Sequence, residues 1–292
     1  MARQFQDKLC VYCQEHKSTS RHGDHVIARG FFPDGNRTVA DVPIRVPACQ
    51  YCNAASCSAE QYLIALLAPS INSVHPAAGE VARGPVTRSI AVPEAQGVWK
   101  RIQKDAQLGI LMSADGHYIA TTPVVQPEYA AYDNVFRKIT KGLYYHHFAA
   151  YFPLDYEIAL FSADRTSCDQ FWIETPGFDL TKLFEIGDGI FRYAYTNSTN
   201  DHADMMWLMC FYQGHYFYVR TGPPKKVGDI LEYGGSINGI AAGRYILKER
   251  SRDLATLCVA ATDIYSGLCE SPITIQVAPS CLALFRFVGK IK

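Results

Sequence analysis

The sequence has no excess of charge of either sign. Its 292 residues include 28 Lys and Arg and 28 Asp and Glu, which gives a formal net charge of +0 at pH 7. Proteins that hold nucleic acid through their overall charge are usually basic. The balance counts against that mode of binding, so any contact with nucleic acid must be local or supplied by a partner.

Long apolar runs are missing as well. The longest one in the first third is "YLIALLAPSI", residues 62–71, which is too short to cross a bilayer. The first ten residues, "MARQFQDKLC", have no apolar core of the kind found in signal peptides. We expect a cytoplasmic protein without membrane contact, whose ten cysteines are free thiols or metal ligands rather than disulfides.

The composition is that of a folded chain. Hydrophobic residues make up 48% and charged residues 19%, which predicts an ordinary packed core and argues against disorder. The length suggests two or three domains. We predict an α+β protein divided into a metal-bound module over 1–70, a connector without regular structure over 71–97, an α+β domain over 98–226, and a β-rich region over 227–292 that is either separate or part of the same domain.

Local patterns predict several elements. Apolar residues at helical spacing follow Ser58, which we expect to cap a helix that runs to about residue 67. The strongest helical pattern covers 127–152, where aromatic and aliphatic residues recur every three to four positions. From residue 153 onward, aromatic and β-branched runs separated by turns predict strands. One hairpin is expected around Gln213 and Gly214.

The sequence contains two cysteine pairs with the same inner spacing, Cys10–Cys13 and Cys49–Cys52. Two residues between the members of a pair allow both sulfurs to reach one ion, and four thiolates suit tetrahedral zinc. The 35 residues between the pairs must fold back as a loop or hairpin. We predict a structural zinc site, because four thiolates close the coordination shell and leave no open position for chemistry.

Asp24 and His25 lie between the two pairs and are followed by "VIARGFF". The second pair lies within "VPACQYCN", and Asn53 directly follows its last cysteine. This set resembles the zinc-stabilised HNH endonucleases, which have the ββα-metal (His-Me finger) fold. The resemblance covers residues 8–67. It implies a treble-clef-like ββα module, hydrolysis of nucleic-acid phosphodiester bonds, DNA as the expected polymer, and a setting such as restriction or antiviral defence.

The resemblance also implies roles for three residues. His25 matches the general base, and Asp24 matches the residue that binds a divalent ion. Asn53 matches the second ligand of that ion. Phosphodiester hydrolysis needs an activated water and a positive charge near the leaving oxygen, and carboxylate and amide oxygens suit Mg²⁺ or Mn²⁺.

Two departures from the family pattern lead to an alternative. The family carries an Asn about five residues before the third cysteine, but this chain has Ile44 there, so that Asp41, Asn36 or a backbone carbonyl would have to orient His25. The run 54–60, "AASCSAE", has no basic residue where related proteins often have Lys. The alternative is a zinc-binding protein that has lost catalysis and serves protein–protein or nucleic-acid interaction. In both cases we expect residues 98–292 to be a recognition or assembly region, through which a protein partner or a second copy of the chain binds.

Other residues near the motif carry two interpretations each. Cys57 either approaches the divalent ion or is a buried thiol. Glu60 is either an additional metal ligand or a first-turn carboxylate that favours the helix dipole. Four arginines of this region either hold a backbone phosphate or are simply exposed: Arg21, Arg29, Arg37 and Arg45. His16 and His22 either contact phosphate or zinc or are exposed loop residues. His146 and His147 suit a helix C-terminus. We expect the core to include Tyr144, Tyr145, Trp172, Trp207 and Phe211.

Overall fold

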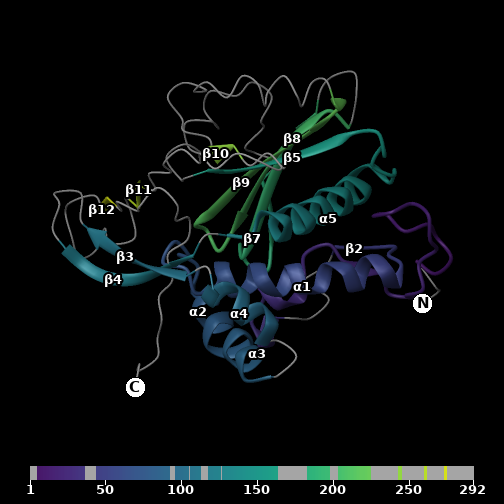
Figure 1. Ribbon diagram of the computed structural model, residues 1–292. Helices are drawn as coiled ribbons and strands as arrows, with labels where there is room; N and C mark the ends of the chain where they lie inside the picture. Colours follow the sequence, from purple (N-terminus) through teal and green to yellow (C-terminus); the bar gives the residue numbers. More distant parts are fainter. Residues whose placement is uncertain are drawn as a thin grey trace.

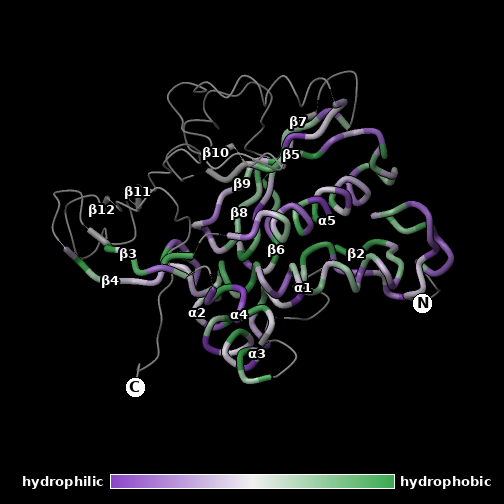
Figure 2. The backbone as a smooth tube through the Cα atoms, in the orientation of Figure 1, coloured by the Kyte–Doolittle hydropathy of each residue, from purple (hydrophilic) through white to green (hydrophobic). Residues whose placement is uncertain are grey.

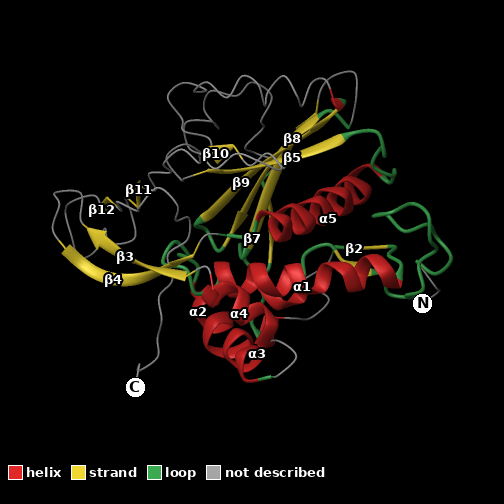
Figure 3. Cartoon of the chain, viewed as in Figure 1, coloured by secondary structure: helices red, strands yellow, loops and turns green. Residues whose placement is uncertain are grey.

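The computed structural model describes residues 5–36, 44–92, 96–104, 106–112, 118–125, 127–163, 183–197, 203–224, 243–244, 260–261 and 273–274. Within these residues the chain is a mixed α+β protein, as predicted (Figure 1). Short strands come first, and a group of helices follows. A separate two-stranded hairpin, one further long helix and a large antiparallel sheet come next. Figure 3 shows this separation of helices and strands.

The first elements form a small two-stranded unit followed by a helix. Strand β1 (Asp24–His25) pairs antiparallel with β2 (Arg45–Val46). Two single-turn 3₁₀ helices, η1 (Arg29–Phe31) and η2 (Asp34–Asn36), lie between them in the sequence. The long helix α1 (Gln50–Leu67) follows directly after the second strand.

The cap of helix α1 lies nine residues before the predicted one, at Cys49 instead of Ser58. Cys49 has extended backbone angles, and its sulfur accepts a hydrogen bond from the backbone N–H of Cys52. Cys49 is therefore the N-cap, and the expectation that Ser58 caps the helix is wrong. Glu60 consequently lies in the third turn of α1 and is buried, which also overturns its placement in a first turn.

The predicted connector over 71–97 is helical along much of its length. It contains α2 (Pro76–Val81), a π-helical turn η3 (Ala82–Val86) and α3 (Thr87–Ala91). The His75 ring caps α2 by accepting from the backbone N–H of Ala77. Pro85 lies inside the π turn, which accommodates its missing N–H donor. Small buried residues such as Ala77 and Ala78 pack this segment onto the core.

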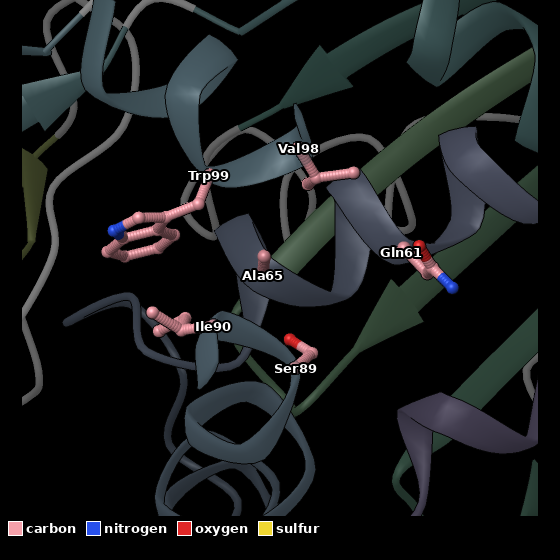
Figure 4. A pocket seen from close by; sticks show the side chains of 6 residues that line it. All are labelled: Gln61, Ala65, Ser89, Ile90, Val98 and Trp99. Carbon is pink, nitrogen blue, oxygen red and sulfur yellow. The ribbon is translucent and has the colours of Figure 1, made fainter. Parts of the chain in front are cut away.

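Helix α4 (Gln96–Lys104) packs beside α1 and is followed by the hairpin of β3 (Ala106–Met112) and β4 (Tyr118–Val125). Figure 4 shows Val98 and Trp99 of α4 facing α1 and α3 across a small cavity. Its volume of about 10 Å³ suits one water molecule at most. This cavity is therefore a packing feature and not a ligand site.

The main sheet has six antiparallel strands in the order β10-β5-β9-β8-β7-β6. In Figure 1, α5 (Tyr129–Phe148) lies between this sheet and α1. Two further short strands pair with each other, β11 (Ala260–Ala261) with β12 (Ile273–Thr274). The sheet strands are β5 (Glu157–Ala163), β6 (Phe184–Ile186), β7 (Phe191–Asn197), β8 (Met205–Phe211), β9 (His215–Gly222) and β10 (Gly243–Arg244).

One buried core joins the first residues to the sheet. It runs without interruption from Cys10 to Val219, and Figure 2 shows hydrophobic segments gathered where α1, α5 and the sheet meet. The Phe31 ring lies 4.6 Å from that of Phe211 in β8, and the Phe136 ring of α5 lies 4.4 Å from that of Phe217 in β9. The predicted boundary at residue 70 therefore does not coincide with a break in the core.

The predicted aromatic core is confirmed for the residues that the structure describes. Tyr144, Trp207 and Phe211 are buried, and Tyr145 packs against the same cluster. Trp172 lies outside the described residues. Among the described helices, none is both long enough and apolar enough to span a membrane.

The hairpin predicted around Gln213 and Gly214 joins β8 to β9. Tyr212 and Gln213 both have positive φ, which is the geometry of a tight turn that follows the twist of the strands. A Cβ added to Gly214 would lie 1.5 Å from the backbone oxygen of Asn72. The turn between β8 and β9 can approach Asn72, which lies shortly after α1 in the chain, only because residue 214 is glycine.

We expect Gly214→Ala to lower the free energy of unfolding by about 3 kcal/mol, because the backbone must move to relieve this overlap. Urea unfolding followed by circular dichroism measures the change. Gly97→Ala is the matched control, since a Cβ there meets nothing within 4 Å. An equal midpoint for Gly214→Ala and the wild-type protein would contradict the expectation.

Candidate metal centre and the Asp24–His25 strand

The four predicted cysteines lie together. Their sulfur atoms are all within 4.8 Å of one another, and the Cys13 and Cys49 sulfurs are 3.9 Å apart. Four sulfurs at about 2.3 Å from a zinc ion at the centre of a tetrahedron are about 3.8 Å apart. The cluster is therefore compatible with a structural zinc site, and within the described residues it is the one group of this kind.

Two backbone turns hold the cysteines in place. Gln14 has a positive φ of 59°, and its N–H donates to the Cys10 carbonyl at 2.9 Å, which closes the turn around the first pair. The second pair sits on the first turn of α1. The N–H of Val11 donates to the Pro47 carbonyl at 2.9 Å. This bond joins the two turns and brings the pairs face to face.

The electrostatics of the cluster favour a cation. Burial raises the pKa of Cys10, and burial together with the bond to the Cys49 thiol raises that of Cys52. For Cys13, burial is outweighed by the backbone N–H groups of Glu15 and His16, and the pKa falls to about 6. Four neighbouring thiolates repel one another, so full deprotonation requires a bound cation, as it does for zinc.

Asp24 and His25 form the whole of strand β1. Asp24 pairs with Val46 and His25 with Arg45, and both side chains are half-buried. Adjacent residues of a strand project to opposite faces. The pairing is compatible with side chains that point apart, and the roles of Asp24 and His25 stay predictions.

Asp24 is tied directly to the cysteine cluster. Tyr12 lies between the two cysteines of the first pair, and its hydroxyl donates to Asp24 Oδ2 at 3.2 Å. Burial first, and then the Asp24 charge, raises the pKa of Tyr12, so this phenol remains a donor at neutral pH. The first cysteine turn thus positions the Asp24 carboxylate through the Tyr12 side chain.

The second partner of Asp24 is a lysine that sequence reasoning missed. Lys138 of α5 places its Nζ 2.7 Å from Asp24 Oδ2 and 2.5 Å from Glu60 Oε1 of α1. The Lys138 side chain is 5% exposed and each carboxylate 12%. Burial alone would lower the pKa of Lys138, but Glu60 and Asp24 outweigh it and raise that pKa. The ammonium is therefore held in its charged form.

The face of α1 beside this ion pair carries Asn53, Cys57 and Glu60, which are spaced by four and three residues. Asn53 is exposed and begins this face, about 10 Å along the helix axis before Glu60. Among the described residues, no hydrogen bond or ion pair joins the Asn53 side chain to Asp24. The structure thus pairs Asp24 with Glu60 through Lys138, and the role of Asn53 stays a prediction.

Cys57 differs from the buried thiol that was one of its two interpretations. It is exposed, and its Sγ donates to the Asn53 carbonyl at 3.1 Å. Ile44, at the position of the missing Asn, is buried, and its carbonyl accepts from the N–H of Val26 at 3.1 Å. That carbonyl is therefore already engaged by the backbone next to His25.

The remaining candidate residues differ in their exposure. His16 and His22 are exposed, as are Arg21 and Arg29, and Arg45 is half-buried. His16 Nδ1 lies 3.7 Å from the Cys13 sulfur. His146 and His147 lie in the last turn of α5, far along the chain from the strand. Asp41 and Arg37 fall outside the described residues, and nothing is described of the Asn36 side chain.

Comparison with known protein families, with curated proteins and with solved structures found no match to this chain.

Proposed function

We propose that the protein is a metal-dependent endonuclease of the HNH type that hydrolyses phosphodiester bonds, with DNA as its expected substrate. One observation carries the proposal: a strand made of Asp24 and His25 pairs antiparallel with the strand that leads into α1, and a four-cysteine cluster clamps this unit. That order of elements suits a treble-clef-like ββα-metal module.

The donors fit the proposed ions. The cysteine cluster suits Zn²⁺, whereas Asp24, with Asn53 or Glu60 as further oxygen donors, suits Mg²⁺ or Mn²⁺. A divalent ion at Asp24 supplies positive charge near the leaving oxygen. His25 takes the proton of the attacking water at a ring nitrogen, and the exposed Arg21 and Arg29 hold the backbone phosphate. Tyr12 and the cysteine cluster fix the Asp24 carboxylate.

A second candidate function follows from Lys138. Its ammonium already neutralises much of the Asp24 charge, as a divalent ion would. This favours a zinc-binding interaction protein that keeps the ββα frame without cleavage. In that case the surface of the α+β region, residues 98–292, binds a protein partner or a second copy of the chain.

A cleavage assay separates the two. Zinc-loaded protein is incubated with supercoiled plasmid in Mg²⁺ or Mn²⁺, and nicking is followed with time, with single-stranded DNA and RNA as parallel substrates. We expect His25→Ala to reduce the rate at least about 100-fold, which is the range for a general base. The matched control is His146→Ala, an exposed histidine in the last turn of α5.

The control variant is expected to cleave at the wild-type rate. Zinc content and circular dichroism of both variants establish that the fold is retained. If the wild-type protein and His25→Ala show the same cleavage with every substrate and metal, the nuclease proposal fails and the interaction protein is favoured.

A further inference from the structure

A buried cation bridges two acidic side chains at the point where three elements meet. The carboxylates come from β1 and α1, at Asp24 and Glu60, and the ammonium comes from α5, at Lys138. These residues are far apart in sequence, so their meeting is a property of the folded chain. The pair of carboxylates and the one ammonium leave one negative charge in excess.

The ammonium occupies the place that a divalent ion on Asp24 needs. Lys138 Nζ is already 2.7 Å from Asp24 Oδ2 and 2.5 Å from Glu60 Oε1. An Mg²⁺ or Mn²⁺ ion binds carboxylate oxygen at about 2.1 Å, and two cations within about 4 Å of each other repel strongly at the effective dielectric of a partly buried site. The two cations therefore exclude each other at this pair of carboxylates.

Two further contacts, both with Tyr12, hold Lys138 and its helix in place. Its Nζ lies 5.7 Å from the centre of the Tyr12 ring, where a cation is attracted to the ring face. One turn later on α5, Lys141 Nζ donates to the Tyr12 carbonyl at 2.9 Å. Helix α5 is thus anchored on the same turn that holds the first cysteine pair, with Lys138 directed at the acidic pair.

We propose that Lys138 and a divalent cation are alternative occupants of the Asp24–Glu60 pair, so that α5 carries a built-in competitor that weakens metal loading. The proposal rests on the proposed function only in taking Asp24 as a ligand of the divalent ion. The observed affinity for that ion is the intrinsic affinity reduced by the fraction of molecules in which Lys138 has withdrawn. Glu60 is then the second carboxylate of the metal-bound state.

The test measures Mn²⁺ binding by the loss of the free-ion electron paramagnetic resonance signal, using the full-length zinc-loaded protein. Mn²⁺ does not displace zinc from four thiolates, which prefer the softer ion. We expect Lys138→Met to tighten Mn²⁺ binding about tenfold or more, since removal of the competing cation leaves both carboxylates to the ion. Lys138→Arg keeps a cation and is expected to bind as weakly as the wild-type protein.

The matched control is Lys141→Met. It removes a positive charge from the same helix, but Lys141 bonds a carbonyl and not the acidic pair, so the expected change in affinity is less than about threefold. Adding Asp24→Asn to Lys138→Met is expected to abolish the gain. Equal Mn²⁺ affinity in the wild-type protein and Lys138→Met would overturn the proposal.

A second readout uses the wild-type protein and does not depend on the folding of a variant. Lys138 is 5% exposed and should resist reductive methylation until Mn²⁺ displaces its ammonium. We expect saturating Mn²⁺ to increase methylation of Lys138, but not of Lys141, as measured by peptide mass spectrometry. Unchanged labelling at saturation would overturn the competition. Neither readout involves cleavage, so failure of the nuclease proposal would be recognised separately.

Discussion

Replacing Cys49 by serine is expected to release zinc and to lower the free energy of unfolding by more than about 4 kcal/mol. Cys49 is 2% exposed and has two structural roles. Its sulfur belongs to the four-cysteine cluster, and it caps α1 by accepting from the Cys52 N–H. A serine can still cap a helix, so the loss arises mainly from the cluster.

The expected damage extends beyond the cysteine turns. The first turn carries Tyr12, which bonds Asp24, and Gln14, whose amide donates to the Phe152 carbonyl at 2.5 Å. Loss of the ion is therefore expected to loosen β1, through Tyr12, and the contact of the first cysteine turn with the segment that follows α5. Elemental analysis for zinc and urea unfolding measure the two effects, and a chelator added to the wild-type protein should reproduce them.

Cys57→Ser is the matched control, because Cys57 lies on the same helix but is exposed and outside the cluster. It is expected to retain one zinc per chain and the wild-type midpoint. If Cys49→Ser also retained zinc at that ratio, or if the wild-type protein contained none, the cysteine cluster would have another explanation.

The cysteine cluster could be predicted from the sequence because the spacing that indicates it lies within each short cysteine pair. Two residues between paired cysteines predict that both sulfurs face one point, and the structure brings the two pairs together as that spacing requires. The long helix over 129–148 and the hairpin at Gln213 likewise follow from short-range periodicity and turn chemistry.

Predictions failed where the deciding contact was unusual or distant. The start of α1 was missed because its cap is a cysteine, a residue with little general preference for that position. The helices within 71–97 were missed because Gly84 and Pro85 normally end helices, whereas here a π turn carries the chain through. Ala77 and Ala78 are buried in that segment, but their burial depends on neighbours that the sequence does not identify.

The partner of Asp24 could not be found from local sequence at all. Lys138 is 114 positions away and belongs to a buried face of α5, where Val135 one turn before it and Gly142 one turn after it are both buried. A lysine on such a face is a weak indication that it pairs with a buried carboxylate, because lysine is rarely buried without a partner. The sequence does not show which acid that is.

Lys138→Met is expected to lower the free energy of unfolding by about 3–5 kcal/mol in the absence of divalent ions, which is the cost of breaking a buried ion pair from one side. Methionine matches the length of the lysine stem, so little packing is lost. The cost arises because Asp24 and Glu60 then face each other without a cation, each with 12% of its side chain exposed. Urea unfolding of zinc-loaded protein with trace divalent ions removed measures the change.

Neutralising the acids tests this cause. The triple variant Asp24→Asn, Glu60→Gln, Lys138→Met keeps the side-chain volumes without any charge, and such replacements of buried ion pairs are often neutral or stabilising. We expect it to recover most of the lost stability, whereas a packing defect at residue 138 would persist in it. Mn²⁺ should stabilise Lys138→Met more than the wild-type protein, because an ion that binds only the folded state raises its stability by RT ln(1 + [Mn²⁺]/Kd), which grows as Kd falls. An equal response of the two proteins to Mn²⁺ would mean that the Asp24–Glu60 pair accepts no ion even when the ammonium is gone.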